Sequence, residues 1–273
     1  MPIAAVTPVG WLIAQERRNR AIATIENAFG VLRQVMGAAL VDNRITRNPC
    51  DGVQLRKRKH ADRGYLSHTQ VASLAAAIEY GPEVVRFVSY TGLRWRAMAA
   101  LRVGDFDMLR RRVNVSRSVT EFNGLVWSTP KSWERRSVPF PTALAAELSA
   151  LMVGKGREDL VFASQRGDVL RASNFRKRFF AAAVEKCKAA DKAFPTITPH
   201  DLRHTAASLA VSAGANVKAV QRMLGHAKAS MTLDVYADLF DDDLDGVAAS
   251  LDVAIKSAAD KSAAEALRTR STQ

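Results

Sequence analysis

The chain has 273 residues, of which 48% are hydrophobic, and its 40 Lys and Arg residues exceed its 27 Asp and Glu residues to give a formal charge of +13. The length suits one large or two modest domains with a buried core, and the excess of positive charge is typical of a protein that binds a polyanion, most often nucleic acid. The two cysteines, Cys50 and Cys187, match no metal-binding spacing, and the chain shows neither a signal peptide nor an apolar run long enough to span a membrane, so we expect a cytoplasmic protein with no membrane partner.

The first 54 residues are predicted to be helical. Thr7 followed by Pro8 is typical of a helix start. Apolar residues then recur at three- and four-residue steps and predict one stripe along a long helix that ends before Pro49: Ile22, Ile25, Phe29, Leu32, Met36 and Leu40. Residues 55–64, "LRKRKHADRG", are basic and without periodicity, which indicates a linker between domains that could also contact phosphates.

The remainder reads as a second, larger domain. Ser67 and Gln70 form a predicted capping box and Leu66 with Val71 a hydrophobic staple. We expect helices over about 67–79 and 82–91, and another from near Arg94. Alternating segments at 112–119, 124–129 and 135–140 predict one small antiparallel sheet, after which the pattern is helical again. The predicted fold class is therefore mainly α with a small antiparallel sheet (α+β).

The segment "TPHDLRHT" places two basic side chains on one helix face. Thr198 is the predicted N-cap with Pro199 just inside the helix, and His200 lies three residues before Arg203. Such a pair is more often a solvated helix face than a site, and no third ligand is spaced to suit zinc, so we expect no metal.

Four other residues have equally ordinary explanations when each is taken alone. Arg94 follows a glycine turn and could be a surface arginine, and Lys131 in a predicted hairpin could serve only solubility. His226 follows Gly225 in a turn, and Tyr236 could be a core tyrosine.

Together, in this order and spacing, the motifs resemble the tyrosine recombinase (phage integrase) family. "TGLR" matches the family's first arginine box, "TPK" its hairpin lysine, "HDLRHT" its His-x-x-Arg box, "LGH" its third basic position, and Tyr236 its nucleophile. The resemblance covers residues 65–245 and extends more loosely over 1–60. It implies a partial helical core-binding domain (1–54), the linker (55–64), a catalytic domain (65–245) and a charged, Ala-rich tail (246–273), and it leads us to expect an N-terminally truncated prophage-type integrase.

The resemblance also implies a reaction. Tyr236 would attack a phosphodiester and become joined to the DNA 3′-phosphate, while Arg94, Arg203 and His226 donate hydrogen bonds to the non-bridging oxygens. Planar arginines suit this task because the transition state gathers negative charge on those oxygens.

Proton transfer falls to the two remaining family positions. Lys131 would protonate the departing 5′-oxygen, and His200 would accept the proton of the phenol. Neither a metal nor another cofactor is expected, since these cations supply the electrostatic stabilisation. The implied partners are double-stranded DNA attachment sites, three further copies of the chain in a homotetramer on DNA, and accessory DNA-bending or directionality proteins.

The sequence departs from the family at Arg96 and Ala97, where a glycine and an acidic residue are usual. Loss of the acid is expected to affect the orientation of the catalytic arginines. Two alternatives therefore stay open: a degenerate integrase fragment or helix-turn-helix-like protein that only binds DNA, with Gly214 in the turn, and a type IB topoisomerase.

Overall fold

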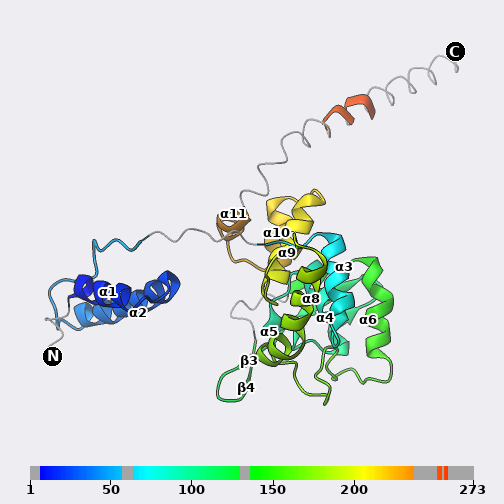
Figure 1. The fold of residues 1–273 in the computed structure, drawn as a ribbon, viewed down its shortest axis with the longest axis horizontal. Coiled ribbons are helices and arrows are strands. Elements are labelled where there is room, and N and C mark those ends of the chain that lie inside the picture. The colour runs from blue at the N-terminus through cyan, green and yellow to red at the C-terminus, as the bar shows by residue number, and fades with distance from the viewer. Residues whose placement is uncertain (1–6, 57–63, 130–135, 237–250, 254, 258–273) are drawn as a thin grey trace, which may run out of the picture. The chain divides into compact units, whose positions relative to one another are not determined.

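The structure is a computed structural model that describes residues 7–56, 64–129, 136–236, 251–253 and 255–257 (Figure 1). The chain divides into two compact units, Met1–Arg63 and Gly64–Gln273, and each is described by itself. Helices predominate in the described residues and the strands are short, which confirms the predicted fold class.

The first unit is a pair of helices, α1 (Pro8–Arg17) and α2 (Ile22–Val41). The predicted stripe of α2 is confirmed at its centre, where Ile25, Phe29 and Met36 are buried. Its two ends remain partly open, because Ile22 is 39% and Leu40 37% exposed. Thr7 precedes α1 as predicted, but its side chain makes no capping hydrogen bond.

The second unit holds the other helices. Ser67 begins the first of them as predicted: it accepts from the Gln70 N–H while the Gln70 side chain accepts from the Ser67 N–H, which confirms the capping box. The α-helices are α3 (His68–Ala77), α4 (Pro82–Thr91), α5 (Trp95–Met98), α6 (Ala145–Met152), α7 (Ala172–Phe175), α8 (Ala181–Ala190), α9 (Asp201–Ser212), α10 (Val217–Leu224) and α11 (Ser230–Tyr236). Short 3₁₀ turns lie at Val103–Asp105 and Thr142–Leu144, and one π-helical turn lies at Arg176–Phe180.

The strands form two sheets, so the prediction of one sheet is wrong. Strands β1 (Phe106–Asp107), β2 (Arg112–Val115) and β5 (Arg136–Pro139) make one antiparallel sheet, and β3 (Ser118–Glu121) with β4 (Leu125–Ser128) makes the other. A continuous strand over 112–119 would put Arg117 on the same face as Val113 and Val115. The strand instead ends at Val115, and Arg117 pairs with Asp105 at 3.5 Å.

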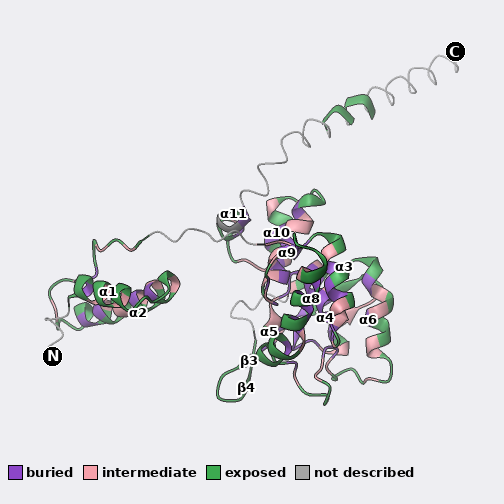
Figure 2. Cartoon of the chain, in the orientation of Figure 1, coloured by how far each residue is buried: buried purple, intermediate pink, exposed green. Residues whose placement is uncertain are grey.

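Helix α4 runs through the middle of this unit, and buried residues gather along it (Figure 2). Phe87 packs on Phe162 with ring centroids 4.8 Å apart. Full burial of a side chain of this size stabilises the fold by roughly 1.5–3 kcal/mol. The helix ends at Gly92, whose φ of +63° is left-handed and whose missing Cβ would lie 2.6 Å from Leu224 of α10. The end of α4 and the end of α10 are thereby brought together.

No helix in the described parts of the chain combines the length and the apolar character that a membrane span requires. In the tail, residues 251–253 and 255–257 are helical and exposed.

Candidate active site

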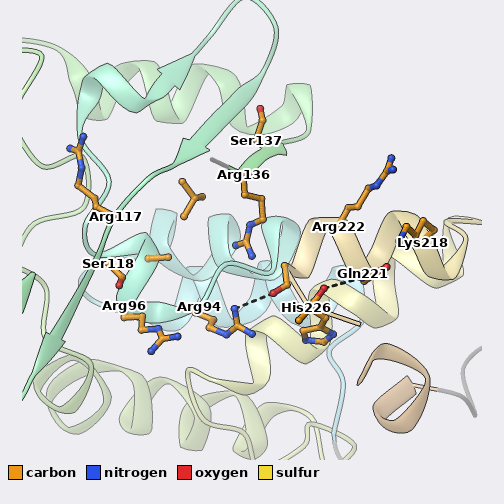
Figure 3. A pocket seen from close by; sticks show the side chains of 14 residues that line it. Arg94, Arg96, Arg117, Ser118, Arg136, Ser137, Lys218, Gln221, Arg222 and His226 are labelled. Carbon is orange, nitrogen blue, oxygen red and sulfur yellow. Dashed lines mark hydrogen bonds between the residues drawn. The ribbon is translucent and has the colours of Figure 1, made fainter. Parts of the chain in front are cut away.

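A cavity of about 950 Å³ lies among α5, β2, β5 and the turn that follows α10 (Figure 3). Its lining is basic, and it contains no Asp or Glu among the residues that the structure describes. The cationic side chains that line it are Arg94, Arg96, Arg117, Arg136, Lys218 and Arg222. A concave surface of one charge sign concentrates ions of the opposite sign, so this cavity suits a phosphate group.

Arg94 reaches the cavity from the start of α5. Gly92 ends α4 in the left-handed conformation, and Arg94 takes an extended conformation at the N-cap position two residues later. Its Nη1 donates a long hydrogen bond of 3.5 Å to the carbonyl oxygen of Gly225. Burial and the positive charge of Arg96 lower the pKa of Arg94, as expected for a cation that has no neighbouring carboxylate.

Arg203 is buried on α9 and is 3% exposed. Its Nη1 donates to the carbonyl oxygen of Gly92, so the turn after α4 holds this side chain as well. Its Nη2 is buried without a hydrogen-bond partner in the described structure. Burial, followed by the charges of Arg94 and Arg136, lowers the pKa of Arg203 to about 9. A buried, unpaired guanidinium nitrogen is costly, and an incoming anion would relieve that cost.

His226 is held at the cavity by the turn after α10. Gly225 ends the helix with a φ of +66° and donates its N–H to the Gln221 carbonyl oxygen at 2.8 Å. His226 Nδ1 shares a hydrogen bond of 3.0 Å with Thr232 Oγ1, and Gln221 Nε2 donates to the His226 carbonyl oxygen at 3.0 Å. Burial and then the charges of Arg203 and Arg94 lower the pKa of His226 to about 4. The imidazole is therefore neutral at pH 7.

Tyr236 is the last residue of α11 and is 1% exposed. It packs in a small core cluster with Val211, Val220 and Leu224, so the core interpretation describes its ring correctly. The hydroxyl, however, shares a hydrogen bond of 2.7 Å with His204 Nδ1. The phenol also lies close enough to Arg203 to raise the pKa of that guanidinium.

The structure brings several of the predicted residues together. Arg94 and His226 line the cavity, Arg203 couples electrostatically to both, and Tyr236 couples to Arg203. The ring of His200 meets that of His204 edge-on, with centroids 5.1 Å apart. Lys131 lies outside the described residues.

The predicted N-cap at Thr198 is wrong. Helix α9 begins at Asp201, and both the N–H and the hydroxyl of Thr198 donate to the Asp201 carboxylate at 2.7 Å. An N-cap side chain accepts a hydrogen bond from a backbone N–H. The Thr198 hydroxyl instead donates to the Asp201 carboxylate, and a charged acceptor makes the stronger hydrogen bond.

Sequence reasoning missed two residues of this region. His204 is the direct partner of the Tyr236 hydroxyl, and its signal was its place one turn after His200. Arg136 lines the cavity from β5. Its signal was the alternation of that strand, which puts it on the same face as the buried Val138.

Known proteins resemble this chain over most of its length. The chain is 27% identical over 249 residues to the transposase of transposon Tn916 from Enterococcus faecalis, an alignment that covers 83% of this chain and 61% of the relative. It is 27% identical over 236 residues to the tyrosine recombinase XerC of Mycobacterium bovis, covering 81% of this chain and 74% of that one. The chain thus spans about three fifths (61%) of the first of these relatives.

A solved structure shows the same fold. The Tn1549 transposon integrase in complex with a circular intermediate DNA superimposes with a TM-score of 0.76 at 24% identity, over 86% of this chain and 82% of that one. Residues 65–242 match the model of the phage integrase family, which is more than half of the sequence. The chain therefore belongs to the phage integrase family.

Proposed function

We propose that the chain breaks and rejoins DNA at specific sites through a covalent bond between Tyr236 and a 3′-phosphate. The observation that carries the proposal is the group of arginines without a carboxylate. Burial and the charges of Arg94 and Arg136 lower the pKa of Arg203, and the neighbouring cavity has no acidic lining in the described residues. A DNA phosphate would supply the missing negative charge.

The arginines and His226 would act on the transition state. Charge develops on the non-bridging oxygens as the phenol oxygen attacks phosphorus, and guanidinium groups can donate two hydrogen bonds each. Arg203 has a buried nitrogen available for this purpose, and Arg94 lines the cavity directly. His226 is neutral at pH 7, so it would stabilise a non-bridging oxygen with a hydrogen bond and not with a positive charge.

Tyr236 would supply the attacking oxygen. An ordinary phenol has a pKa of about 10, so the proton must be removed as the bond to phosphorus forms. His204 already shares a hydrogen bond with this hydroxyl, and His200 contacts His204. The proton acceptor predicted at His200 thus has a second candidate in His204. The 5′-oxygen would leave with a proton from Lys131, and a 5′-hydroxyl of another strand would reverse the step.

The proposed partners follow from the same chemistry. Double-stranded DNA with attachment sites is the substrate, and the Tn1549 integrase and a lambda integrase dimer are both known as complexes with DNA. Exchange of strands between two duplexes requires four nucleophiles, so a homotetramer on DNA, assisted by DNA-bending or directionality proteins, stays part of the proposal. The assignment of residues 1–54 to core binding, and the location in the cytoplasm, are proposed with it.

The test is covalent capture on a nicked DNA that cannot be rejoined. The DNA carries a candidate attachment site from the sequence flanking the gene and a label on the strand end that stays bound to the protein. We expect the full chain to form a covalent protein–DNA band and Tyr236→Phe to form none, while binding is nearly unchanged because many Lys and Arg side chains set the affinity.

Tyr90→Phe is a matched control. Its hydroxyl also shares a hydrogen bond with a histidine, His68, at 3.0 Å, but outside the cavity. We expect this variant to keep the covalent band. A band that persists in Tyr236→Phe would remove Tyr236 as the nucleophile.

A chain that only binds DNA is the second candidate. It is favoured by the departure at Arg96 and Ala97. Arg96 stands where a glycine is usual and lowers the pKa of Arg94, and Ala97 stands where an acidic residue is usual. Salt-sensitive binding with no covalent band from the wild-type chain would establish it. Relaxation of supercoiled DNA without preference for a site would instead favour the type IB topoisomerase.

A further inference from the structure

Arg136 enters the cavity from β5, on the side opposite Arg94. Successive side chains of a strand point to opposite faces, so Arg136 lies on the same face as the buried Val138, and Ser137 lies on the other face. Figure 3 shows its side chain extending from the strand toward Arg94 and the turn that carries His226. None of the recombinase motifs in the sequence includes this residue.

One edge of the Arg136 guanidinium is already occupied. Its Nη1 donates to the carbonyl oxygen of Leu224 at 2.7 Å, which is one of the last carbonyls of α10. A Cβ at Gly225 would lie only 1.5 Å from this nitrogen. The guanidinium therefore fills the space that a side chain at Gly225 would need, and it ties β5 to the Gly225–His226 turn.

The remainder of the guanidinium is not satisfied within the described structure. Its Nε is buried without a hydrogen-bond partner. Burial, followed by the charge of Arg94, lowers the pKa of Arg136 to about 10. Arg136 contributes in turn to the lowered pKa of Arg203 and of His226. A residue that served only to hold the turn would not need a buried Nε that lacks a partner in the described structure, beside Arg94, Arg203 and His226.

We propose that Arg136 is a third arginine of the phosphate site, which donates to a non-bridging oxygen of the scissile phosphate while its Nη1 holds the turn that carries His226. The proposal rests on the proposed function. Arg136 would then have two roles. It would position His226 through Leu224 and Gly225, and it would stabilise negative charge in the transition state.

The experiment measures covalent capture by the full chain with two versions of the nicked DNA. One has an ordinary scissile phosphate, and the other has a methylphosphonate, in which a methyl group replaces one charged oxygen. We expect Arg136→Ala to slow capture of the ordinary DNA by about a hundredfold or more, the effect of losing one transition-state donor. The defect should shrink by about tenfold or more on the methylphosphonate, because less charge then needs stabilisation.

Two variants make the result specific. Arg112→Ala removes the same charge from an exposed position on β2, in the same sheet, and we expect capture close to that of the wild type. Arg136→Lys keeps the charge but loses the planar fork, and we expect slow capture with DNA binding retained. Urea unfolding of each variant shows whether the fold is intact.

Equal defects of Arg136→Ala on the two DNAs would overturn the proposal, since the loss of a donor to a charged non-bridging oxygen must matter less when that charge is absent. Capture at the wild-type rate would overturn it as well. Both results leave the proposed function in place, because the wild-type chain still forms the covalent band. A wild-type chain that forms no band would overturn the proposed function and this inference with it.

Discussion

Replacement of Gly225 by alanine tests how the active-site turn is built. Gly225 combines two demands that a side chain cannot meet. Its φ of +66° is left-handed. A Cβ at this position would lie 1.5 Å from Arg136 Nη1, so the absence of a side chain leaves room for the guanidinium. Alanine should therefore strain the backbone and displace the guanidinium from the Leu224 carbonyl oxygen.

The two effects have separate magnitudes. A non-glycine residue in the left-handed region costs about 1–2 kcal/mol. Loss of the charged hydrogen bond from Arg136 to Leu224, 2.7 Å long in the wild type, costs about 1.5–3 kcal/mol. Gly225→Ala should thus lower the free energy of unfolding by about 2.5–5 kcal/mol. In an Arg136→Ala background only the backbone cost of about 1–2 kcal/mol should remain.

Urea unfolding of the wild type, both single variants and the double variant gives the coupling between the two residues. We expect a coupling of about 1.5–3 kcal/mol, with the double variant more stable than the sum of the single effects implies. If Gly225→Ala is as destabilising without Arg136 as with it, the guanidinium does not occupy the glycine's space and the reasoning is refuted.

The remaining predictions concern the ionisable groups of the site. The pKa of His226 falls from its ordinary 6.5 to about 4 in the folded chain, so the unfolded chain binds this proton more readily. The free energy of unfolding should therefore decline as the pH falls from 6.5 to about 4. His226→Gln should flatten this decline in unfolding experiments across the same pH range, and Arg136→Ala should raise the His226 pKa measured by NMR; an unchanged pH profile would contradict the assignment. Arg94→Ala should slow covalent capture by at least about a hundredfold with a much smaller loss of binding, and near-wild-type capture would remove Arg94 from the site. Lys131→Ala should slow capture too, but less when sulfur replaces the leaving 5′-oxygen, because a thiolate departs without a proton; equal defects on both substrates would argue against the general acid.

Much of this protein could be predicted from neighbouring residues alone. The stripe of α2 follows from the three- and four-residue spacing of Ile25, Phe29 and Met36, and the start of α3 from the Ser67–Gln70 capping box. Both are local effects that act within one or two turns of a helix. The order and spacing of the basic motifs and Tyr236 likewise sufficed to indicate the family.

The tertiary structure decided what distant residues do to one another. Arg136 meets the Leu224 carbonyl across 88 residues of sequence, and His204 meets Tyr236 across 32. No local pattern encodes such contacts, since they depend on how α9 packs on α4 and how α10 packs on α9, α11 and β5. The division into two sheets has the same origin. Alternation predicted one strand over 112–119, but the first sheet ends at Val115 and the second begins at Ser118. Arg117 lies between them and pairs with Asp105, and only the packed fold sets where that carboxylate lies.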